Sequence, residues 1–387
     1  MSSRELSDRR KQQRGTTNPS RSSRIAASIE SANTNATNKK RAAAWSLWLK
    51  HIAKQSISSP FLVDSSRKAK LRLCESFCDS VRHGELGTRQ KSPIHSSTIR
   101  NLVAQINQTF RENDFKPPFL DRHGKLQYSV EKLLRSYANE DPGSKCQPAL
   151  PPEFFSKVLE NFRSMQSIQC DYGMALCELT CIAALFGMRS VEYTDTNDKK
   201  PKTKKIRVDD IKFIFNRVDP PHLHSNADMV SINFPNQKNG VRNQRITRPK
   251  STSSALAGYC PVLLLASLFS RIKSYIYQDP NPPINLCMKD GFHHKITYQE
   301  MIKFHKRVAA SVGESIIGFP PSRIGTHSMR VTFATCLYIA GFSDAIIKSE
   351  GRWKSDAFLR YIRLQATTQT YNITEALTRP QHSQIYL

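Results

Sequence analysis

The sequence predicts a mainly α-helical protein with one small antiparallel β-sheet, divided into two domains. Its 387 residues are more than a single hydrophobic core usually serves. Apolar residues recur at helical spacing through most of the chain, whereas runs with strand character occur only in the middle. The expected order is therefore an all-α domain, a linker, and a mixed domain whose helices flank the sheet.

Residues 1–40 are rich in Ser, Arg, Asn and Thr and carry almost no large apolar side chain, which predicts a disordered basic arm. Residues 41–140 then repeat amphipathic stripes at helical spacing, which predicts a compact all-α domain. The stripes are Trp45/Trp48/Leu49/Ile52, Leu71/Cys74/Cys78/Val81, Ile99/Leu102/Val103/Ile106/Phe110 and Val130/Leu133/Leu134/Tyr137. Residues 141–152, with several prolines and a glycine, are expected to form a linker.

The second domain, residues 153–376, is expected to begin with helices. Its first helix is predicted near Pro152–Met165, and a long apolar helix over Ile168–Phe186 ends at Gly187. Three runs then have strand character, and Asn239-Gly240 between the last two is a hairpin turn signal. The runs are Ile206–Phe215, Met229–Phe234 and Gln244–Thr247. After Ser254 the pattern is helical again to about residue 376, and residues 377–387 form a tail.

The net charge of +26 predicts a polyanionic partner, for which nucleic acid is the first candidate. The excess is +7 in residues 1–44, +7 in residues 45–140 and +12 in residues 141–387, so several surfaces are expected to face phosphate. The longest markedly apolar run, Pro261–Phe269, is far too short to span a bilayer, and no membrane partner is expected.

The nine cysteines form no C-x-x-C pair, which is typical of a reducing compartment. Two groups were weighed as zinc ligands, Cys287 with His293 and His294, and His222 with His224. Neither supplies four ligands at a recognised spacing, so we expect no metal.

The most informative segment is Thr326–Arg330, with the sequence THSMR. Thr326 is a candidate cap for an apolar helix that stops at Gly341. His327 and Arg330 are three residues apart, so both project from one side of its first turn. The backbone amides there lie at the positive end of the helix dipole, which suits a phosphate.

Other charged residues, two of them suited to a phosphate, occur where predicted helices or strands end. Arg189 and Glu192 follow the long apolar helix, and Lys238 is expected at the tip of the hairpin. Downstream, the turn GRWKS over residues 351–355 precedes a predicted helix, Asp356–Leu364. Tyr361 shares a stripe of that helix with apolar residues, and periodicity alone would make it a core aromatic.

These pieces, in this order, resemble the tyrosine recombinases, the phage-integrase family. The elements that match are Arg189 with Glu192, the hairpin Lys238, the His327-x-x-Arg330 pair and Tyr361. The segment Ile324–Arg363 is most similar to recombinases of Crypton-type and DIRS-type eukaryotic mobile elements. The resemblance covers roughly residues 152–376, and residues 41–140 are similar in kind to the family's α-helical, SAM-like core-binding domain.

The resemblance implies cleavage and rejoining of DNA through a 3′-phosphotyrosyl intermediate, without a metal or any other cofactor. Tyr361 would attack the phosphodiester, and His327 would accept or relay its proton. Arg189 and Arg330 would bind the non-bridging oxygens through forked hydrogen bonds, and Lys238 would protonate the leaving 5′-oxygen.

A sixth catalytic residue, Trp353, a supporting residue, Glu192, and two open assignments complete the implied site. Glu192 would orient the neighbouring arginine, and Trp353 would pack against the phosphate. The family usually has His or Trp nine residues before the nucleophile, and here that position is Arg352. We assign the role to Trp353, one residue later, with Arg352 as the alternative. Tyr371 is the fallback nucleophile.

The expected protein is a site-specific recombinase or integrase of a mobile genetic element, acting on double-stranded DNA as a homotetramer on two sites. The basic run Lys199–Lys205 is a candidate nuclear import signal, and Asn38–Arg41 is a weaker one. The main alternative is a domesticated, catalytically inactive DNA-binding descendant. A type IB topoisomerase and a basic scaffold or ribosome-associated protein are the other classes weighed.

Overall fold

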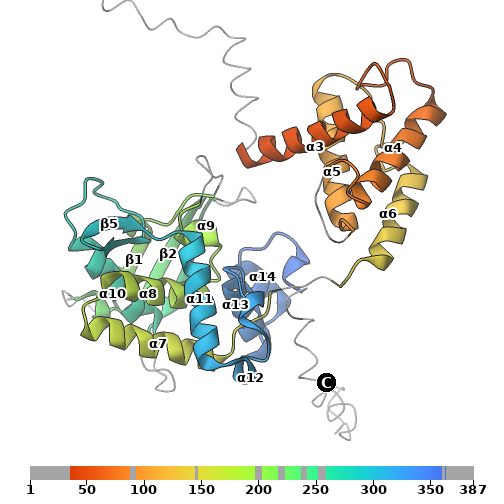
Figure 1. The fold of residues 1–387 in the computed structure, drawn as a ribbon. Coiled ribbons are helices and arrows are strands. Elements are labelled where there is room, and N and C mark those ends of the chain that lie inside the picture. The colour runs from red at the N-terminus through yellow and green to blue at the C-terminus, as the bar shows by residue number, and fades with distance from the viewer. Residues whose placement is uncertain are drawn as a thin grey trace, which may run out of the picture. The chain divides into compact units, whose positions relative to one another are not determined.

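The computed structural model describes residues 35–87, 93–143, 147–196, 203–216, 223–236, 242–251, 259–359 and 362. The chain divides into two compact units between Ser144 and Lys145, inside the segment expected to be a linker (Figure 1). No helix in the described ranges is both long and apolar enough to cross a bilayer.

The first unit contains four described helices, α3 (Asn35–Lys54), α4 (Arg67–Arg82), α5 (Ser96–Glu112) and α6 (Tyr128–Glu140). Its core centres on the fully buried Trp48, whose ring lies 5.4 Å from that of Phe77 and 5.6 Å from that of Phe119. The indole N–H donates to Pro60 O at 2.9 Å, so the buried polar atom is satisfied. The four predicted helices are confirmed.

One boundary of this unit differs from the expectation. Residues 35–40 belong to α3, so the predicted disorder up to residue 40 is wrong from Asn35 onward. Apart from Ala36 these residues are polar, and they give no amphipathic signal. A helix already nucleated by the stripe that starts at Trp45 extends into such a segment at little cost, because each added residue closes another hydrogen bond.

The second unit is built around helix α8 (Asp171–Leu185), of which ten of the 15 residues are buried, as expected of a helix enclosed on most sides. The helices that pack against it are α7 (Pro152–Ser167), α10 (Pro261–Lys273), α11 (Tyr298–Val312) and α13 (Ser328–Ile339) (Figure 1). The short helices α9 (Ser190–Tyr193), α12 (Glu314–Ile317) and α14 (Asp344–Glu350) connect the longer elements.

The predicted three-stranded sheet is present. Strands β1 (Ile211–Ile214), β2 (Met229–Asn236) and β3 (Arg242–Pro249) are antiparallel in the order β1-β2-β3. Val230 and Ile232 are fully buried on β2, so the central strand anchors the sheet in the core. The Asn239-Gly240 turn lies outside the described residues. The fold class, mainly helical with a small antiparallel sheet, is confirmed.

Two expectations for this unit are corrected. The segment after Ser254 is not wholly helical, because β4 (Leu286–Lys289) and β5 (Phe292–Lys295) form a second hairpin. Its turn, Asp290-Gly291, has φ of 51° and 81°, the left-handed pair that a tight hairpin requires. Helix α8 begins at Asp171 rather than Ile168, since Gln169 has φ of 52° and turns the chain before it.

A buried ion pair connects the central helix to its neighbours. Glu178 of α8 is fully buried, and its Oε2 accepts from Arg271 Nη2 at 2.8 Å and Nε at 3.1 Å. Its Oε1 accepts from Ser267 Oγ at 2.7 Å, and Arg271 also donates to Leu286 O of β4 at 3.2 Å. The pair therefore joins α8, α10 and the second hairpin.

Arg271→Met should destabilise the second unit strongly, because it leaves the Glu178 carboxylate buried without its counter-charge. We expect a loss of about 3–5 kcal/mol in the free energy of unfolding, measured by urea denaturation followed by circular dichroism. The double variant Glu178→Gln/Arg271→Met should be less destabilised than Arg271→Met alone. A loss below about 1 kcal/mol in the single variant would show that the pair is not structural.

Candidate active site

The C-terminal end of α8 is surrounded by arginines from three distant parts of the chain. The last carbonyls of a helix have no partner within it, and they lie at the negative end of its dipole. Here β3, α13 and the turn after α14 each supply a guanidinium to them. The bonds run from Arg248 Nε to Leu185 O (3.1 Å), from Arg352 Nη1 to Phe186 O (2.9 Å) and from Arg330 Nη1 to Gly187 O (2.5 Å).

Gly187 allows the chain to leave the helix at this point. Its φ is +53°, and a Cβ added there would lie 2.7 Å from the ring of Phe333. A side chain would therefore meet both backbone strain and a steric clash. The glycine predicted to stop the helix is required by the packing as well as by the turn.

Glu192 lies between two guanidiniums just beyond that turn. It is 1% exposed, and its Oε1 accepts from Arg189 Nη1 at 3.0 Å. Its Oε2 accepts from the Arg189 backbone N–H at 2.8 Å and from Arg352 Nη2 at 2.8 Å. These are the contacts that an orienting carboxylate needs. The Arg189 side chain keeps 21% of its surface exposed, so it can still meet a ligand.

His327 and Arg330 occupy the first turn of α13, as their spacing predicts. His327 itself is the N-cap residue, so the expected cap at Thr326 is wrong. Arg330 is 1% exposed, and its Nη2 donates to Gly351 O at 2.7 Å. Its guanidinium carbon lies 4.4 Å from the ring centre of Trp353. Arg330 therefore holds α13, the end of α8 and the turn after α14 together.

The imidazole of His327 is at the surface of the unit, beside the arginine cluster formed by Arg189, Arg248, Arg330 and Arg352. Partial desolvation, together with the positive charges of Arg330 and Arg189, lowers its pKa to about 4. The ring is therefore neutral at pH 7. A neutral imidazole next to two guanidiniums can accept a proton from a hydroxyl group, which a protonated one cannot.

The two candidates for the His or Trp role are placed differently. Arg352 is 2% exposed and points into the unit. Trp353 is partly buried and packs on Phe333 and Phe358, with ring centres 6.4 and 5.6 Å away. Trp353 thus packs against the Arg330 guanidinium, which is compatible with the packing role assigned to it.

Three of the expected residues, Lys238, Tyr361 and Tyr371, lie outside the described residues. The residues on either side of Tyr361 are placed: Phe358 and Ile362 are buried in one cluster with Ala334 of α13 and Ile347 of α14. Phe358 and Ile362 are therefore anchored on the same two helices that border the arginine cluster.

Sequence reasoning missed Arg248. Besides its bond to α8, it pairs with Glu350 Oε2 at 2.6 Å and lies over the rings of Phe186 and Phe333. Arg248 lies in a strand of mostly polar residues, and such a sequence does not indicate that its side chain makes these contacts. The cluster as a whole contains four guanidiniums and two carboxylates, so it carries an excess positive charge suited to a phosphate.

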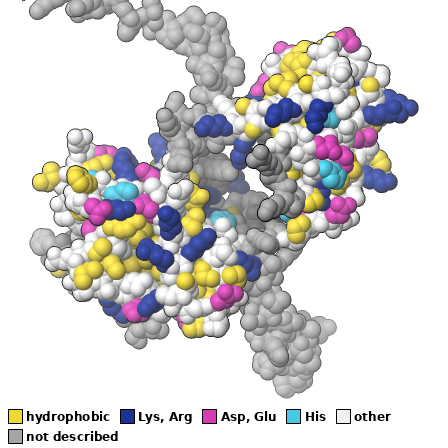
Figure 2. Space-filling view, in the orientation of Figure 1, with side chains coloured by type: hydrophobic (Ala, Val, Ile, Leu, Met, Phe, Trp, Pro, Cys, Tyr) yellow, Lys and Arg dark blue, Asp and Glu magenta, His cyan; other side chains and the backbone are white. Residues whose placement is uncertain are grey.

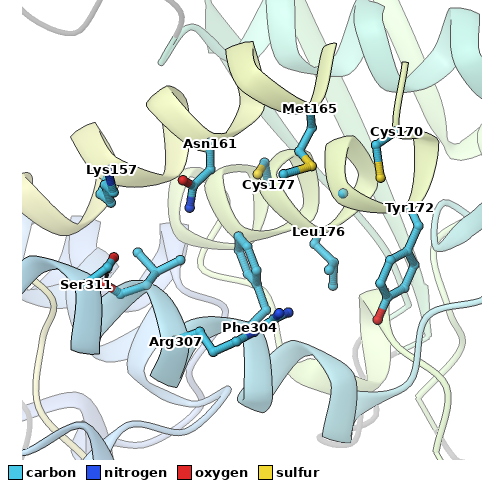
Figure 3. Close-up of a pocket in the computed structure, with 12 residues that line it drawn as sticks. Lys157, Asn161, Met165, Cys170, Tyr172, Leu176, Cys177, Phe304, Arg307 and Ser311 are labelled. Atoms are coloured by element: carbon cyan, nitrogen blue, oxygen red, sulfur yellow. Dashed lines mark hydrogen bonds between the residues drawn. The ribbon is translucent and has the colours of Figure 1, made fainter. Parts of the chain in front are cut away.

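A separate cavity of about 370 Å³ lies between α7, α8 and α11 (Figure 3). Leu176, Phe304 and Met165 are among its mainly apolar lining, with Lys157 and Arg307 also bordering it. The described site residues are not among those that line it.

The described parts of the chain contain no group of three His, Cys, Asp or Glu side chains that could hold a metal. His294, weighed as a ligand, instead contacts Glu300 at 3.0 Å, and Cys287 is fully buried. On the surface, Lys and Arg side chains occur on both units in Figure 2, interspersed with acidic ones.

Comparison with known proteins yields structural likenesses only. No protein-family model matches the chain, and no curated protein matches it in sequence. Among solved structures, the Tn1549 transposon integrase bound to circular intermediate DNA is 15% identical, with a TM-score of 0.42 over 87% of this chain and 99% of that one. XerH recombinase in a post-cleavage complex with difH is 18% identical, with a TM-score of 0.48 over 80% and 72%.

A dimer of lambda integrase on a COC′ core site is similar to the same extent. It is 15% identical to this chain, with a TM-score of 0.40 over 94% of this chain and 95% of that one. These neighbours are integrases and recombinases crystallised with DNA. At such scores the likeness assigns no function, so any function has to be argued from the side chains of the site.

The low pKa of His327 can be measured directly. In the free protein, its ring carbon and proton shifts should titrate with a midpoint near 4 in two-dimensional NMR, with His327→Gln providing the assignment. Arg189→Gln should raise the midpoint, because one of the two neighbouring positive charges is removed. A midpoint near the ordinary value of about 6.5 in the wild type would contradict the described environment.

Proposed function

We propose that this protein is a tyrosine recombinase that cleaves and rejoins double-stranded DNA through a 3′-phosphotyrosyl intermediate. The observation that carries the proposal is the convergence of Arg189, His327 and Arg330 at one end of α8. Arg189 and Arg330 are tied to the same turn by Glu192 and Gly187 O, and both charges act on His327. A positively charged cluster with a neutral imidazole is suited to a phosphodiester and a hydroxyl nucleophile.

The role proposed for each of these three residues follows from the exposure and the charge of its side chain. Arg189, the more exposed guanidinium, binds a non-bridging phosphate oxygen. Neutral His327 takes the proton of the tyrosine hydroxyl, whose ordinary pKa of about 10 keeps it protonated at pH 7. Arg330 donates to the carbonyls of Gly187 and Gly351 and so holds the site together, and its guanidinium adds positive charge to the site.

The nucleophile and the general acid are supplied by the two neighbouring segments. Tyr361 follows Phe358, which anchors its segment in the cluster with α13 and α14. Lys238 belongs to the hairpin of β2 and β3, and β3 is bonded to α14 through Arg248 and Glu350. Tyr361 attacks the phosphorus, and Lys238 gives a proton to the 5′-oxygen as the bond to it breaks.

The partner is duplex DNA, held by basic surfaces on both units, and the active form is a homotetramer on two sites of a mobile genetic element of Crypton or DIRS type. We place the protein in the nucleus, with Lys199–Lys205 as the import signal. Lys205 pairs with Asp195, so the recognised charges are the lysines that precede it.

One observation favours the second candidate, a DNA-binding descendant that no longer cuts. Arg330 is buried and bonded to two carbonyls, as in a site closed to phosphate. The two candidates differ in a single product, the covalent adduct between protein and DNA.

The adduct can be sought without knowing the cognate site. Wild-type protein is incubated with nicked suicide duplexes that carry a randomised core, and covalent complexes are isolated on denaturing gels, sequenced and re-tested. We expect adducts with wild type and their loss in Tyr361→Phe, because phenylalanine has no nucleophilic oxygen. Arg189→Gln should reduce adduct formation at least about 100-fold, the effect of removing one donor to a developing oxyanion.

Tyr128→Phe is the matched control, since Tyr128 is 81% exposed in the first unit and should not affect adducts. Adducts that persist in Tyr361→Phe but vanish in Tyr371→Phe would move the nucleophile to Tyr371. Sequence-selective retention of DNA by wild type without any adduct would establish the binding protein instead of the enzyme.

A further inference from the structure

Arg352 is the most completely enclosed charge near the site. Its side chain has 0% of its surface exposed, and its guanidinium carbon lies 3.5 Å from the ring centre of Phe234 on β2. It donates to Phe186 O at 2.9 Å and to Gly187 O at 3.2 Å. Burial lowers its pKa to about 10, and it therefore remains protonated at pH 7.

Arg352 contacts Glu192 through its side chain and Arg189 through its backbone carbonyl. Its side chain donates to Glu192 Oε2 at 2.8 Å, while Glu192 Oε1 accepts from Arg189 at 3.0 Å. Its backbone carbonyl accepts directly from Arg189 Nη2 at 3.2 Å. Arg352 has φ of +57°, a left-handed conformation that non-glycine residues rarely adopt. Bonds at both ends of the residue hold it in that conformation.

We propose that Arg352 is a positioning residue for Arg189, acting through Glu192 and through its own carbonyl. This inference rests on the proposed function, because it assigns how the phosphate-binding arginine is held. Arg352 occupies the chain position where the family usually has His or Trp, yet its enclosed side chain does not reach the surface that a phosphate would meet. It is therefore not a catalytic residue.

The geometry explains why Arg189 needs such support. The Glu192 carboxylate is buried and needs positively charged partners. If Arg189 were its only such partner, the Arg189 guanidinium would turn toward the carboxylate and would no longer be oriented for a phosphate. The second guanidinium shares this charge, so Arg189 uses Nη1 for Glu192 and Nη2 for the carbonyl of Arg352. Its fork is thus fixed in one orientation on rigid elements, which is what a forked phosphate contact requires.

Neither a charge nor a shape alone can replace Arg352. A lysine would keep the positive charge, but its single ammonium cannot match a planar fork that bonds Glu192, Phe186 O and Gly187 O while stacked on Phe234. A methionine would fill the apolar space over Phe234 without the charge. The two substitutions therefore separate packing from positioning.

The test uses inorganic phosphate as the probe and the full chain as the protein. Phosphate binding is followed by the NMR shifts of His327, and folding stability by urea denaturation. Arg352→Met should weaken phosphate binding by about tenfold, comparable to the loss of one charge-assisted hydrogen bond, and Arg352→Lys should not restore it. Arg352→Met should also destabilise the fold, because Glu192 loses a buried partner.

The double variant Arg352→Met/Glu192→Gln decides between positioning and mere stability. Removing the carboxylate should recover much of the stability but none of the phosphate affinity, because Arg189 loses both the Glu192 carboxylate and the Arg352 side chain that held that carboxylate in place. If phosphate affinity returned with stability, or if Arg352→Lys bound phosphate like wild type, the positioning role would be wrong.

Arg271→Met is a matched control, since it also deprives a buried glutamate of its arginine but belongs to the remote Glu178 network. It should lose stability and keep phosphate affinity. Arg189→Gln distinguishes a failure of the proposed phosphate site from a failure of the role proposed for Arg352. If Arg189→Gln leaves phosphate binding unchanged, the proposed site itself is wrong. If it abolishes binding while Arg352→Met does not affect it, only the role of Arg352 fails.

Discussion

The site depends on the hydrogen bonds between three arginines and the backbone carbonyls at the C-terminal end of α8. A helix that ends inside a protein must find donors for its last carbonyls, since an unpaired buried acceptor costs about 1–3 kcal/mol. Three guanidiniums meet that need at Leu185, Phe186 and Gly187, and each comes from a different element. One helix end thus bonds to residues that are 63 to 166 positions away in the chain.

The same arrangement solves an electrostatic problem. Several arginines packed together repel one another, yet a phosphate site needs them close. The negative end of the helix dipole and the carboxylates of Glu192 and Glu350 offset part of that repulsion. Partial desolvation lowers the pKa of His327, and because the offset is incomplete, the remaining positive charge of Arg330 and Arg189 lowers it further. The charges that hold the fold together therefore also contribute to the acid–base state of the site.

What the sequence could predict is set by the range of the contacts. His327 with Arg330 and Arg189 with Glu192 are separated by three residues, so helical geometry alone brings each pair together. The helices and the three-stranded sheet follow from periodicity in the same way. Arg248 and the inward side chain of Arg352 depend on contacts between distant elements, which no local pattern records. The hairpin of β4 and β5 had a local signal, Asp290-Gly291, but its strands are short and their burial does not alternate.

The two segments that would carry the general acid and the nucleophile share one support. Strand β3 bonds to α14 through Arg248 and Glu350, and Gln244 donates to Ser349 O at 3.3 Å. Strand β2 stacks Phe234 under Arg352, in the turn that leads to the segment of Tyr361. A displacement of the hairpin would therefore strain the turn, and a displacement of the turn would strain the hairpin. In the proposed reaction, which joins proton donation to attack, such coupling would keep β3 and the turn after α14 in fixed positions relative to the helix end where Arg189, the proposed phosphate-binding residue, is also held.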